Sequence, residues 1–204
     1  MPLPLHPKKE RTFVILKPDT VQRSLVGEII RRFENMGLKM VGMKMVQPSE
    51  DMIWKHYNKN DEWFLKKGGN TVENRKKASM PIEKDAIEYG KDIIRGAVKY
   101  IQASPVIALV LEGNQAVAIV KKLVGGTEPT TSDVGTIRGD YALDSYAMSD
   151  FDNSRCVRNL LHCTDKVEEV DFEINLWFKK EELFDYKHIQ DVILYDIHFE
   201  GIKE

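Results

Sequence analysis

The order of elements along the 204-residue chain predicts an α/β or α+β sandwich. Three apolar runs have the length and β-branched content of strands, at Thr12–Leu16, Leu38–Val46 and Pro105–Leu111. Segments whose apolar residues recur at helical spacing lie between them. The sequence contains no internal repeat and no low-complexity segment. A chain of this length has room for one full core, so we expect a single domain over residues 1–204.

The first strand, Thr12–Leu16, should end at Lys17, because the following Pro18 cannot continue central strand pairing. A helix with apolar residues along one side is then expected to begin at Asp19 or Thr20. We expect Gly37 to end this helix, since glycine is common just after a helix C-terminus.

The second strand, Leu38–Val46, shows partial alternation of apolar and polar residues. A short helix is predicted from Pro48 towards Tyr57. Residues 58–100 form the least regular part of the chain, because they are rich in Lys, Asp, Glu and Asn and contain Gly68-Gly69 as a break. Apolar residues between Ile87 and Ile101 indicate a helix that returns to the core.

The second half of the chain begins with the most apolar strand, Pro105–Leu111, and a helix over Ala116–Val124. Residues 125–140 are rich in Gly, Thr and Pro and predict a loop, as does the polar stretch 142–155. Leu160 and Leu161 indicate a short strand. The helix after it should be capped by Thr164 or Asp165, and an apolar patch at 192–195 lies in the tail.

A histidine with a nearby carboxylate is the main chemical feature of the sequence. His162 ends the predicted short strand, and Glu173 would lie about two turns into the following helix. A chain that folds back there brings the carboxylate to the imidazole. A carboxylate partner fixes the tautomer of a histidine and makes its ring a better nucleophile. A lone histidine at a strand end is more often structural, so the catalytic interpretation depends on the rest of the chain.

The composition is that of an ordinary globular enzyme, with 42% hydrophobic and 30% charged residues. The net charge of −2 gives no general nucleic-acid signature, so any anion site must be local. No apolar run is long enough to cross a bilayer. Residues 1–11 read as a loose N-terminal arm without a secretory signal, and we expect Cys156 and Cys163 to be reduced thiols in the cytoplasm. The sequence has no Walker-type glycine loop, CxxC or HExxH motif.

Seven segments, in order, resemble the motifs of the nucleoside diphosphate kinase family. They are Phe13–Asp19, Val26–Ile30, Ser104–Val106, Leu111–Asn114, Gly135–Tyr141, Arg158–His162 and Glu173–Phe178. The matches cover most of the chain, and several ordered motifs are far more specific than one alone. The resemblance implies a ferredoxin-like antiparallel four-stranded sheet with helices on one face. It also implies ping-pong transfer of the γ-phosphoryl group from ATP to a nucleoside diphosphate through a phosphohistidine.

The resemblance assigns the catalytic residues. His162 would carry the phosphoryl group and Glu173 would orient its ring. Thr164 stands where the family usually has serine, and it keeps the hydroxyl that joins this network. Cys163 stands where the family has glycine, and a Cβ there would be costly if the position needs a positive φ.

Cations are also required, because a phosphoryl transition state is anionic. Lys17 at a strand end and Arg138 in the glycine-rich loop coincide with the family's phosphate-binding positions. Lys121 falls where the family has arginine, and lysine gives a weaker, non-bidentate contact. By resemblance, Thr127 binds phosphate and Asn159 binds ribose. Taken singly, each of these residues would be an ordinary surface charge or turn former.

The aromatic residues of the site are less certain from sequence. Tyr57 matches a tyrosine that packs at the family's active site. The family places a base-stacking Phe shortly afterwards, and both Trp63 and Phe64 are candidates here. Either residue could instead pack into a local core.

Two insertions separate this chain from a typical family member, over residues 58–103 and 141–157. We also expect residues 181–204 to be a C-terminal extension. The second insertion lies in the loop that usually builds subunit contacts, and Val134 replaces a common proline there. The resemblance implies a homo-oligomer, and the insertion leaves the number of subunits open. Residues 58–103 are hypothesised to cover the nucleotide site, with Gly68-Gly69 as a hinge; the alternative is a solvated decoration.

These observations predict a cytoplasmic nucleoside diphosphate kinase acting on ATP and nucleoside diphosphates. Mg²⁺ should bridge the nucleotide phosphates, and no dedicated metal-binding residues are expected. We expect neither a membrane nor a specific nucleic acid as partner. The alternative is a non-catalytic member of the family that binds nucleotide or a partner protein.

Overall fold

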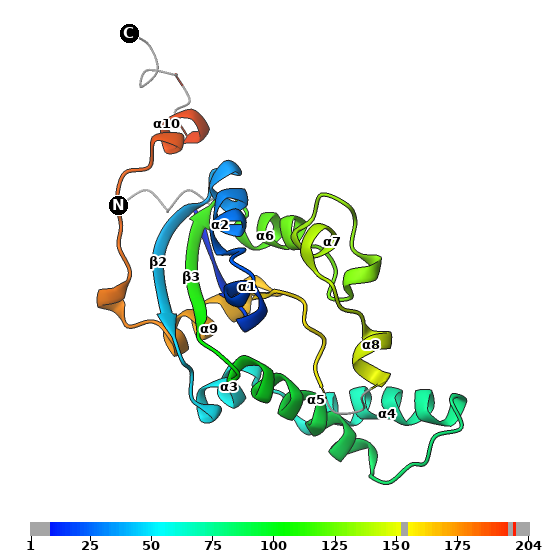
Figure 1. Ribbon diagram of the computed structural model, residues 1–204. Helices are drawn as coiled ribbons and strands as arrows, with labels where there is room; N and C mark the ends of the chain where they lie inside the picture. Colours follow the sequence, from blue (N-terminus) through cyan, green and yellow to red (C-terminus); the bar gives the residue numbers. More distant parts are fainter. Residues whose placement is uncertain (1–8, 152–154, 196–197, 199–204) are drawn as a thin grey trace.

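The structure is a computed structural model that describes residues 9–151, 155–195 and 198 (Figure 1). Its strands, in chain order, are β1 (Glu10–Leu16), β2 (Lys39–Val46), β3 (Val106–Gly113) and β4 (Leu161–Cys163). Its α-helices are α1 (Pro18–Gln22), α2 (Val26–Asn35), α3 (Glu50–Tyr57), α4 (Asp61–Lys77), α5 (Ala86–Ile101), α6 (Ala116–Val124), α7 (Ile137–Tyr141), α8 (Tyr146–Phe151), α9 (Val170–Trp177) and α10 (Ile189–Tyr195). Short 3₁₀ turns lie at Pro129–Thr131, Val167–Glu169 and Lys180–Glu182.

The four strands form one antiparallel sheet in the order β2-β3-β1-β4. The predicted four-stranded α/β sandwich is therefore confirmed. In β1, residues 12–16 are fully buried, as is typical of a central strand that is covered on both faces. Strand β4 is short and pairs with the end of β1, so that Ile15 lies opposite His162.

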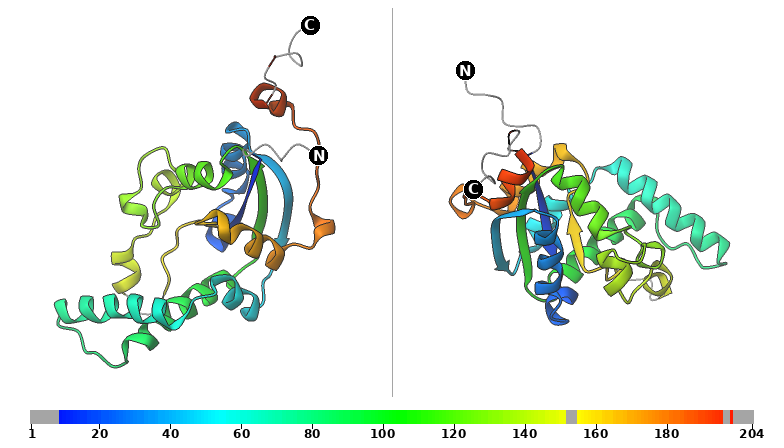
Figure 2. Two further views of the ribbon diagram at one scale, coloured as in Figure 1. Left: turned by 180° about the vertical axis from the view of Figure 1, so that it is seen from behind. Right: turned by 90° about the horizontal axis from the view of Figure 1, so that it is seen from above.

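Helices cover both faces of the sheet, whereas the resemblance implied one face (Figure 2). Phe13 and Ile15 point into a cluster with side chains of α3, α5 and α9. Val14 and Leu16 point to the opposite face, into a cluster with side chains of α2, α6 and α7. Both faces are covered because the side chains that β1 directs to each face are apolar, and burying both sets from water is favourable.

The segment predicted as one helix up to Gly37 consists of two helices, α1 and α2. The chain turns between them at Ser24, whose φ of 56° is left-handed and cannot continue a helix. Gly37 does follow α2, and its φ of 76° is one that glycine adopts readily.

Residues 58–103 are far more regular than predicted. Helices α4 and α5 form a hairpin at one end of the sheet (Figure 1). Gly68-Gly69 lies inside α4 and is neither a break nor a hinge. A Cβ on Gly68 would come within 1.6 Å of the Ala86 carbonyl oxygen, and one on Gly90 within 2.2 Å of the Phe64 carbonyl oxygen. The glycines therefore allow two helix backbones to touch.

Other local predictions were also wrong. Residues Glu10 and Arg11 belong to β1 and not to a loose arm, while residues 1–8 of that arm lie outside the described residues. Helix α8 occupies part of the predicted loop 142–155, and α7 begins within the predicted loop 125–140. The apolar patch at 192–195 lies in α10.

Within the described residues, each helix is too short or too polar to cross a lipid bilayer.

Candidate active site

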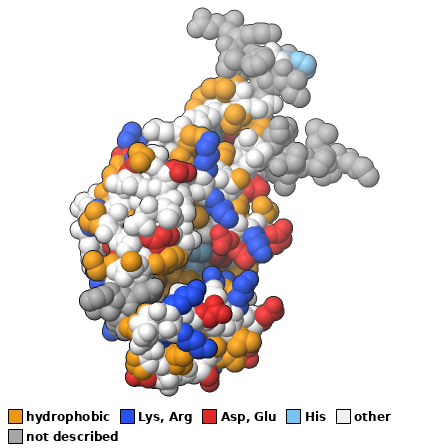
Figure 3. Space-filling view, turned by 90° about the vertical axis from the view of Figure 1, so that its right-hand side faces the viewer, with side chains coloured by type: hydrophobic (Ala, Val, Ile, Leu, Met, Phe, Trp, Pro, Cys, Tyr) orange, Lys and Arg blue, Asp and Glu red, His pale blue; other side chains and the backbone are white. Residues whose placement is uncertain are grey.

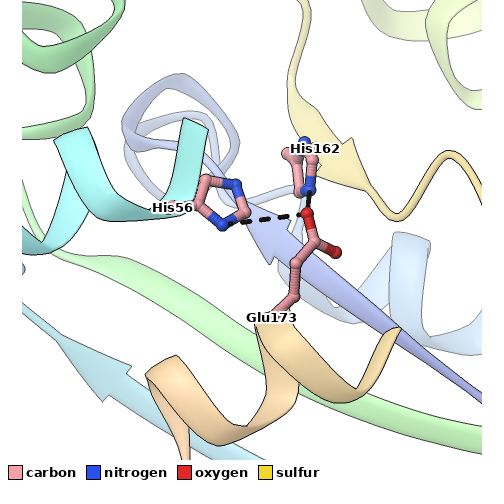
Figure 4. A group of neighbouring side chains, drawn as sticks. All are labelled: His56, His162 and Glu173. Atoms are coloured by element: carbon pink, nitrogen blue, oxygen red, sulfur yellow. Dashed lines mark hydrogen bonds and ion pairs between the residues drawn. The ribbon is translucent and has the colours of Figure 1, made fainter. Parts of the chain in front are cut away.

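His162 and Glu173 meet as expected. The Nε2 atom of His162 on β4 lies 2.8 Å from Oε1 of Glu173, which points up from α9 (Figure 4). The Glu173 side chain is 7% exposed and the His162 side chain 22% exposed. A carboxylate can only accept a hydrogen bond, so Nε2 carries the proton. The lone pair of the imidazole is therefore on Nδ1, the nitrogen away from Glu173.

Thr164 holds the other oxygen of the same carboxylate. Its hydroxyl donates to Oε2 of Glu173 at 2.5 Å and accepts from the backbone N–H of Phe13 at 3.1 Å. Thr164 was predicted to cap the next helix, or Asp165 in its place, and both predictions were wrong. A 3₁₀ turn over Val167–Glu169 intervenes before α9 begins. Both oxygens of Glu173 are thus engaged, and the carboxylate has little freedom to turn away from His162.

Cys163 causes no backbone strain, although it stands where the family has glycine. It lies in β4 opposite Val14, and its φ is not positive. Burial raises the pKa of its thiol to about 11, so the group is a neutral thiol at physiological pH.

Strain lies instead at Leu160, directly before β4. Its φ is 71°, and its side chain is fully buried. The Leu160 N–H donates to Asp19 Oδ2 at 3.3 Å, and its carbonyl accepts from the Thr20 hydroxyl at 2.5 Å. The carbonyl also accepts from the Lys17 N–H at 2.8 Å. These contacts hold an unfavourable backbone conformation two residues before His162.

Lys17, Asn159 and Thr127 form a connected set. The ammonium of Lys17 donates to Oδ1 of Asn159 at 2.7 Å, and Nδ2 of Asn159 donates to the Thr127 carbonyl at 2.9 Å. Burial lowers the pKa of Lys17, with the charge of Arg138 as a further cause. The structure therefore brings the predicted phosphate-binding and ribose-binding residues together.

Arg138 is buried and reaches backbone carbonyls. Its guanidinium donates to the carbonyl oxygens of Asn159, Leu161, Gly125 and Gly126 at 2.7–3.1 Å. It ties helix α7 to the residues that lead into β4. A guanidinium has five N–H donors, so one remains beyond those four contacts.

Lys121 lies on the exposed side of α6 with 46% of its side chain accessible. Its ammonium contacts the Asp165 carboxylate at 3.2 Å and the Asp165 carbonyl at 3.1 Å. Lys121 therefore faces the loop that follows β4, and its helix α6 packs on the same side of the sheet as α7 and Cys163.

The three predicted aromatic residues have different surroundings. Tyr57 ends α3, and its ring lies 5.3 Å from that of His56. Phe64 packs into the core with 8% exposure, and it also lines a cavity of about 300 Å³ together with Tyr57, Asn58, Lys59 and Ile94. Trp63 is partly buried beside Phe64, with Lys59 over its ring.

His56 is a neighbour of His162 that could not be selected from the sequence. The two rings are 4.4 Å apart between centroids and nearly perpendicular. His56 is buried, and no periodicity distinguishes it from a core residue on α3. His56, His162 and Glu173 are the one group of described residues with metal-ligand spacing. Its nitrogen-rich donors do not suit Mg²⁺, which prefers oxygen.

One face of the molecule is hollowed. Figure 3 shows lysine and arginine side chains, interspersed with acidic ones, on the lower part of one face, near a hollow in which a histidine side chain is visible. The chain as a whole is slightly acidic, so an anion site must depend on local positive charge.

Comparison with known proteins gives consistent matches. The family model described as "Nucleoside diphosphate kinase" matches residues 10–94 and 83–183. A nucleoside diphosphate kinase of Pyrobaculum aerophilum is 43% identical over 181 residues, which are 86% of this chain and 98% of that protein. Nucleoside diphosphate kinase A of Canis lupus familiaris is 38% identical over 188 residues, with 92% and 97% coverage.

Solved structures agree. The NDP kinase of Pyrobaculum aerophilum superposes with a TM-score of 0.81 at 41% identity, covering 87% of this chain and all of that one. A transition-state mimic of the Borrelia burgdorferi enzyme, with bound vanadate and ADP, gives a TM-score of 0.74 at 32% identity and covers 90% of this chain and 95% of that one. A Halobacterium salinarum enzyme in complex with CDP gives 0.66 at 33% identity, with 92% and 99% coverage.

Proposed function

Because this chain belongs to the nucleoside diphosphate kinase family and is a phosphotransferase, we propose that His162 carries the phosphoryl group between its two nucleotides. The observation that supports this assignment is the 2.8 Å contact from Nε2 to Glu173, which leaves the lone pair on Nδ1. In the first half-reaction Nδ1 attacks the γ-phosphorus of a nucleoside triphosphate. The N–P bond forms as the bridging β–γ oxygen bond breaks, and the diphosphate leaves with that oxygen. In the second, a β-phosphate oxygen of another diphosphate attacks the phosphohistidine.

Glu173 stabilises the positive charge that the ring acquires when Nδ1 is phosphorylated. The hydroxyl of Thr164 and the burial of the carboxylate keep Glu173 in place. We assign Lys17 and Arg138 to the phosphates, where their charges offset the charge of the transferring group. Asn159 sits between Lys17 and Thr127 and is assigned to the ribose, while Thr127 and Lys121 are assigned to the phosphates.

The proposed substrates are ATP and nucleoside diphosphates of any base. Phe64 lines the cavity beside Tyr57 and, with Trp63, is a candidate for stacking on the base. Mg²⁺ would be held mainly by the nucleotide phosphates, since the group with metal-ligand spacing among the described residues is poor in oxygen. When bound, Mg²⁺ neutralises charge on the β- and γ-phosphates.

We also propose that the protein acts as a homo-oligomer in the cytoplasm. The support for an oligomer is a set of exposed apolar side chains, including Met43 and Met45 on the edge strand β2 and Ile189 on α10. Light scattering coupled to size exclusion measures the number of subunits directly.

The proposal is tested by incubating the protein with γ-labelled ATP and Mg²⁺. We expect an acid-labile phosphoenzyme that ADP, GDP, CDP and dTDP all discharge. His162→Ala should form none, while ADP binding measured by calorimetry remains. A labelled His162→Ala protein, or wild-type protein that binds ADP without becoming labelled, would refute the assignment; the latter result would favour the non-catalytic alternative.

A further inference from the structure

Two histidines lie close to Glu173 and a tryptophan contacts one of them; of the three, only His162 has a role in the proposed function. His56 reaches the site from α3, and its Nδ1 atom lies 3.3 Å from the indole Nε1 of Trp177 on α9. The His56 ring stands edge-on against His162, with its second nitrogen on the side of the His162 ring (Figure 4). The His56 side chain is 1% exposed, and Trp177 is 2% exposed.

The contact with Trp177 determines the tautomer of His56. An indole N–H can donate a hydrogen bond but cannot accept one. Nδ1 of His56 must therefore be the acceptor, and the neutral ring carries its single proton on Nε2. This arrangement is the same as at His162, where the proton is also on Nε2, but the cause is different.

The tautomer matters because His56 is close to the same carboxylate oxygen as His162. Oε1 of Glu173 lies 2.8 Å from His162 Nε2 and 3.8 Å from His56 Nδ1. A proton on His56 Nδ1 would face that oxygen, and a small rotation of the ring would make a charge-assisted hydrogen bond. Glu173 would then be shared between the two histidines.

We propose that the hydrogen bond from Trp177 to His56 reserves Glu173 for His162. Trp177 and His56 are then positioning residues for the phosphoryl carrier, acting through Glu173. This inference rests on the proposed function in one respect, namely that His162 is the residue that is phosphorylated.

The second route by which His56 could acquire a proton on Nδ1 is protonation of the whole ring. Burial holds the pKa of His56 well below its ordinary value, and any positive charge on the neighbouring His162 ring, together with the charges of Lys59 and Lys17, lowers it further. Exchange of the proton between the two nitrogens carries no such penalty. The indole N–H of Trp177 opposes this exchange directly, because two donors cannot face one another.

The first test is Trp177→Phe, which keeps an aromatic ring in the core and removes the N–H. In single-turnover experiments with labelled ATP, we expect phosphoenzyme formation to slow by about 10- to 100-fold, the loss seen when the hydrogen-bond partner behind a metal-binding histidine is removed. The dissociation constant for ADP should stay near the wild-type value, because no proposed nucleotide contact changes.

A matched pair of double variants separates this role from simple loss of packing. Leucine and asparagine are similar in shape, but only asparagine can donate to Glu173. We expect Trp177→Phe/His56→Leu to form the phosphoenzyme faster than Trp177→Phe alone, because the competing donor is gone. Trp177→Phe/His56→Asn should show no such recovery. Equal rates for the two double variants, or a further loss in both, would overturn the proposal.

The tautomer can be measured without catalysis. In ¹⁵N-detected NMR of the wild-type protein without nucleotide, His56 should carry its proton on Nε2 and not on Nδ1; Trp177→Phe should give signal for the Nδ1-protonated form. A wild-type His56 protonated on Nδ1, or an unchanged tautomer in Trp177→Phe, would contradict the inference. Wild-type protein that shows the expected tautomer but never becomes labelled would refute the phosphohistidine assignment alone.

Discussion

At the scale of single residues, hydrogen bonds in the site decide which atoms of each side chain remain free to react. His162 keeps the lone pair of Nδ1 because Nε2 is bonded to Glu173, and Glu173 stays in place because Thr164 holds its second oxygen. The chemistry of a common side chain is therefore specified by its partners and not by its identity alone.

Thr164 gives the first prediction. Thr164→Val keeps the shape but leaves the buried Glu173 oxygen and the Phe13 N–H without a partner, which should cost about 1–3 kcal/mol of unfolding free energy. In a chain of this size, each kcal/mol lowers Tm by roughly 2–4 °C, as scanning calorimetry would show. Thr164→Ser keeps the hydroxyl and is the control. If valine is tolerated as well as serine, the hydroxyl is not needed.

Substitutions of Lys17 and Arg138 should have different effects on kcat and Tm. Lys17→Ala removes a charge that is hydrogen-bonded to the Asn159 amide oxygen, and kcat should fall by about 10²–10³-fold, as for other lost transition-state contacts. Arg138→Lys keeps a charge but leaves several buried carbonyls without a hydrogen-bond donor, so both kcat and Tm should fall. Steady-state kinetics with thermal unfolding measures both. A change confined to KM for Lys17→Ala would show equal binding of ground and transition states.

At the scale of elements, the strands and most helices could be predicted because their apolar periodicity is local information. The sequence also indicated the pair of His162 and Glu173, since a short strand followed by a helix brings such positions together. Three things could not be seen. Helix α4 has little apolar periodicity, so its glycines looked like a break, although they serve a close contact with α5. His56 becomes notable only when α3 and α9 pack against each other. Leu160 shows its strain only in three dimensions.

The hairpin of α4 and α5 gives a prediction with a built-in control. Gly68→Ala would drive a Cβ into the Ala86 backbone, and overpacking of this kind costs about 1–3 kcal/mol. Gly69→Ala meets no atom within 4 Å and should stabilise the protein by about 0.5–1 kcal/mol, because alanine favours helix over glycine. Urea unfolding compares the two variants. Similar midpoints for both would mean that the helices can separate without cost.

At the scale of the whole molecule, the hairpin forms one side of the region that holds Tyr57 and the cavity beside it. Since Gly68-Gly69 is helical, any closing movement cannot use it as a hinge, and α5 is anchored in the core through Ile94, Val98 and Ile101. We still expect residues 58–103 to cover bound nucleotide, with movement concentrated in α4 and the turn before it.

Hydrogen exchange tests this expectation. Amides of α4 should exchange more slowly when ADP and Mg²⁺ are present, because the cover is held closed, while those of α5 change little. The α10 helix, at the far end of the sheet in Figure 1, is the internal control and should not respond. Protection around Arg138 and Asn159 without any in α4 would reduce the insertion to a surface decoration.

The position of β4 affects how the protein can fold while it is being synthesised. Strand β1 is made first, yet the edge of it that carries the site stays unpaired until Leu161–Cys163 arrive about 150 residues later. A chain synthesised only as far as β3 can bury β1 against β3, but it has an open strand edge and lacks His162. On the proposed assignment, activity cannot appear before Glu173 has been made, and a chain truncated before it is expected to be inert. Its exposed β1 edge would be a natural place for a chaperone to bind.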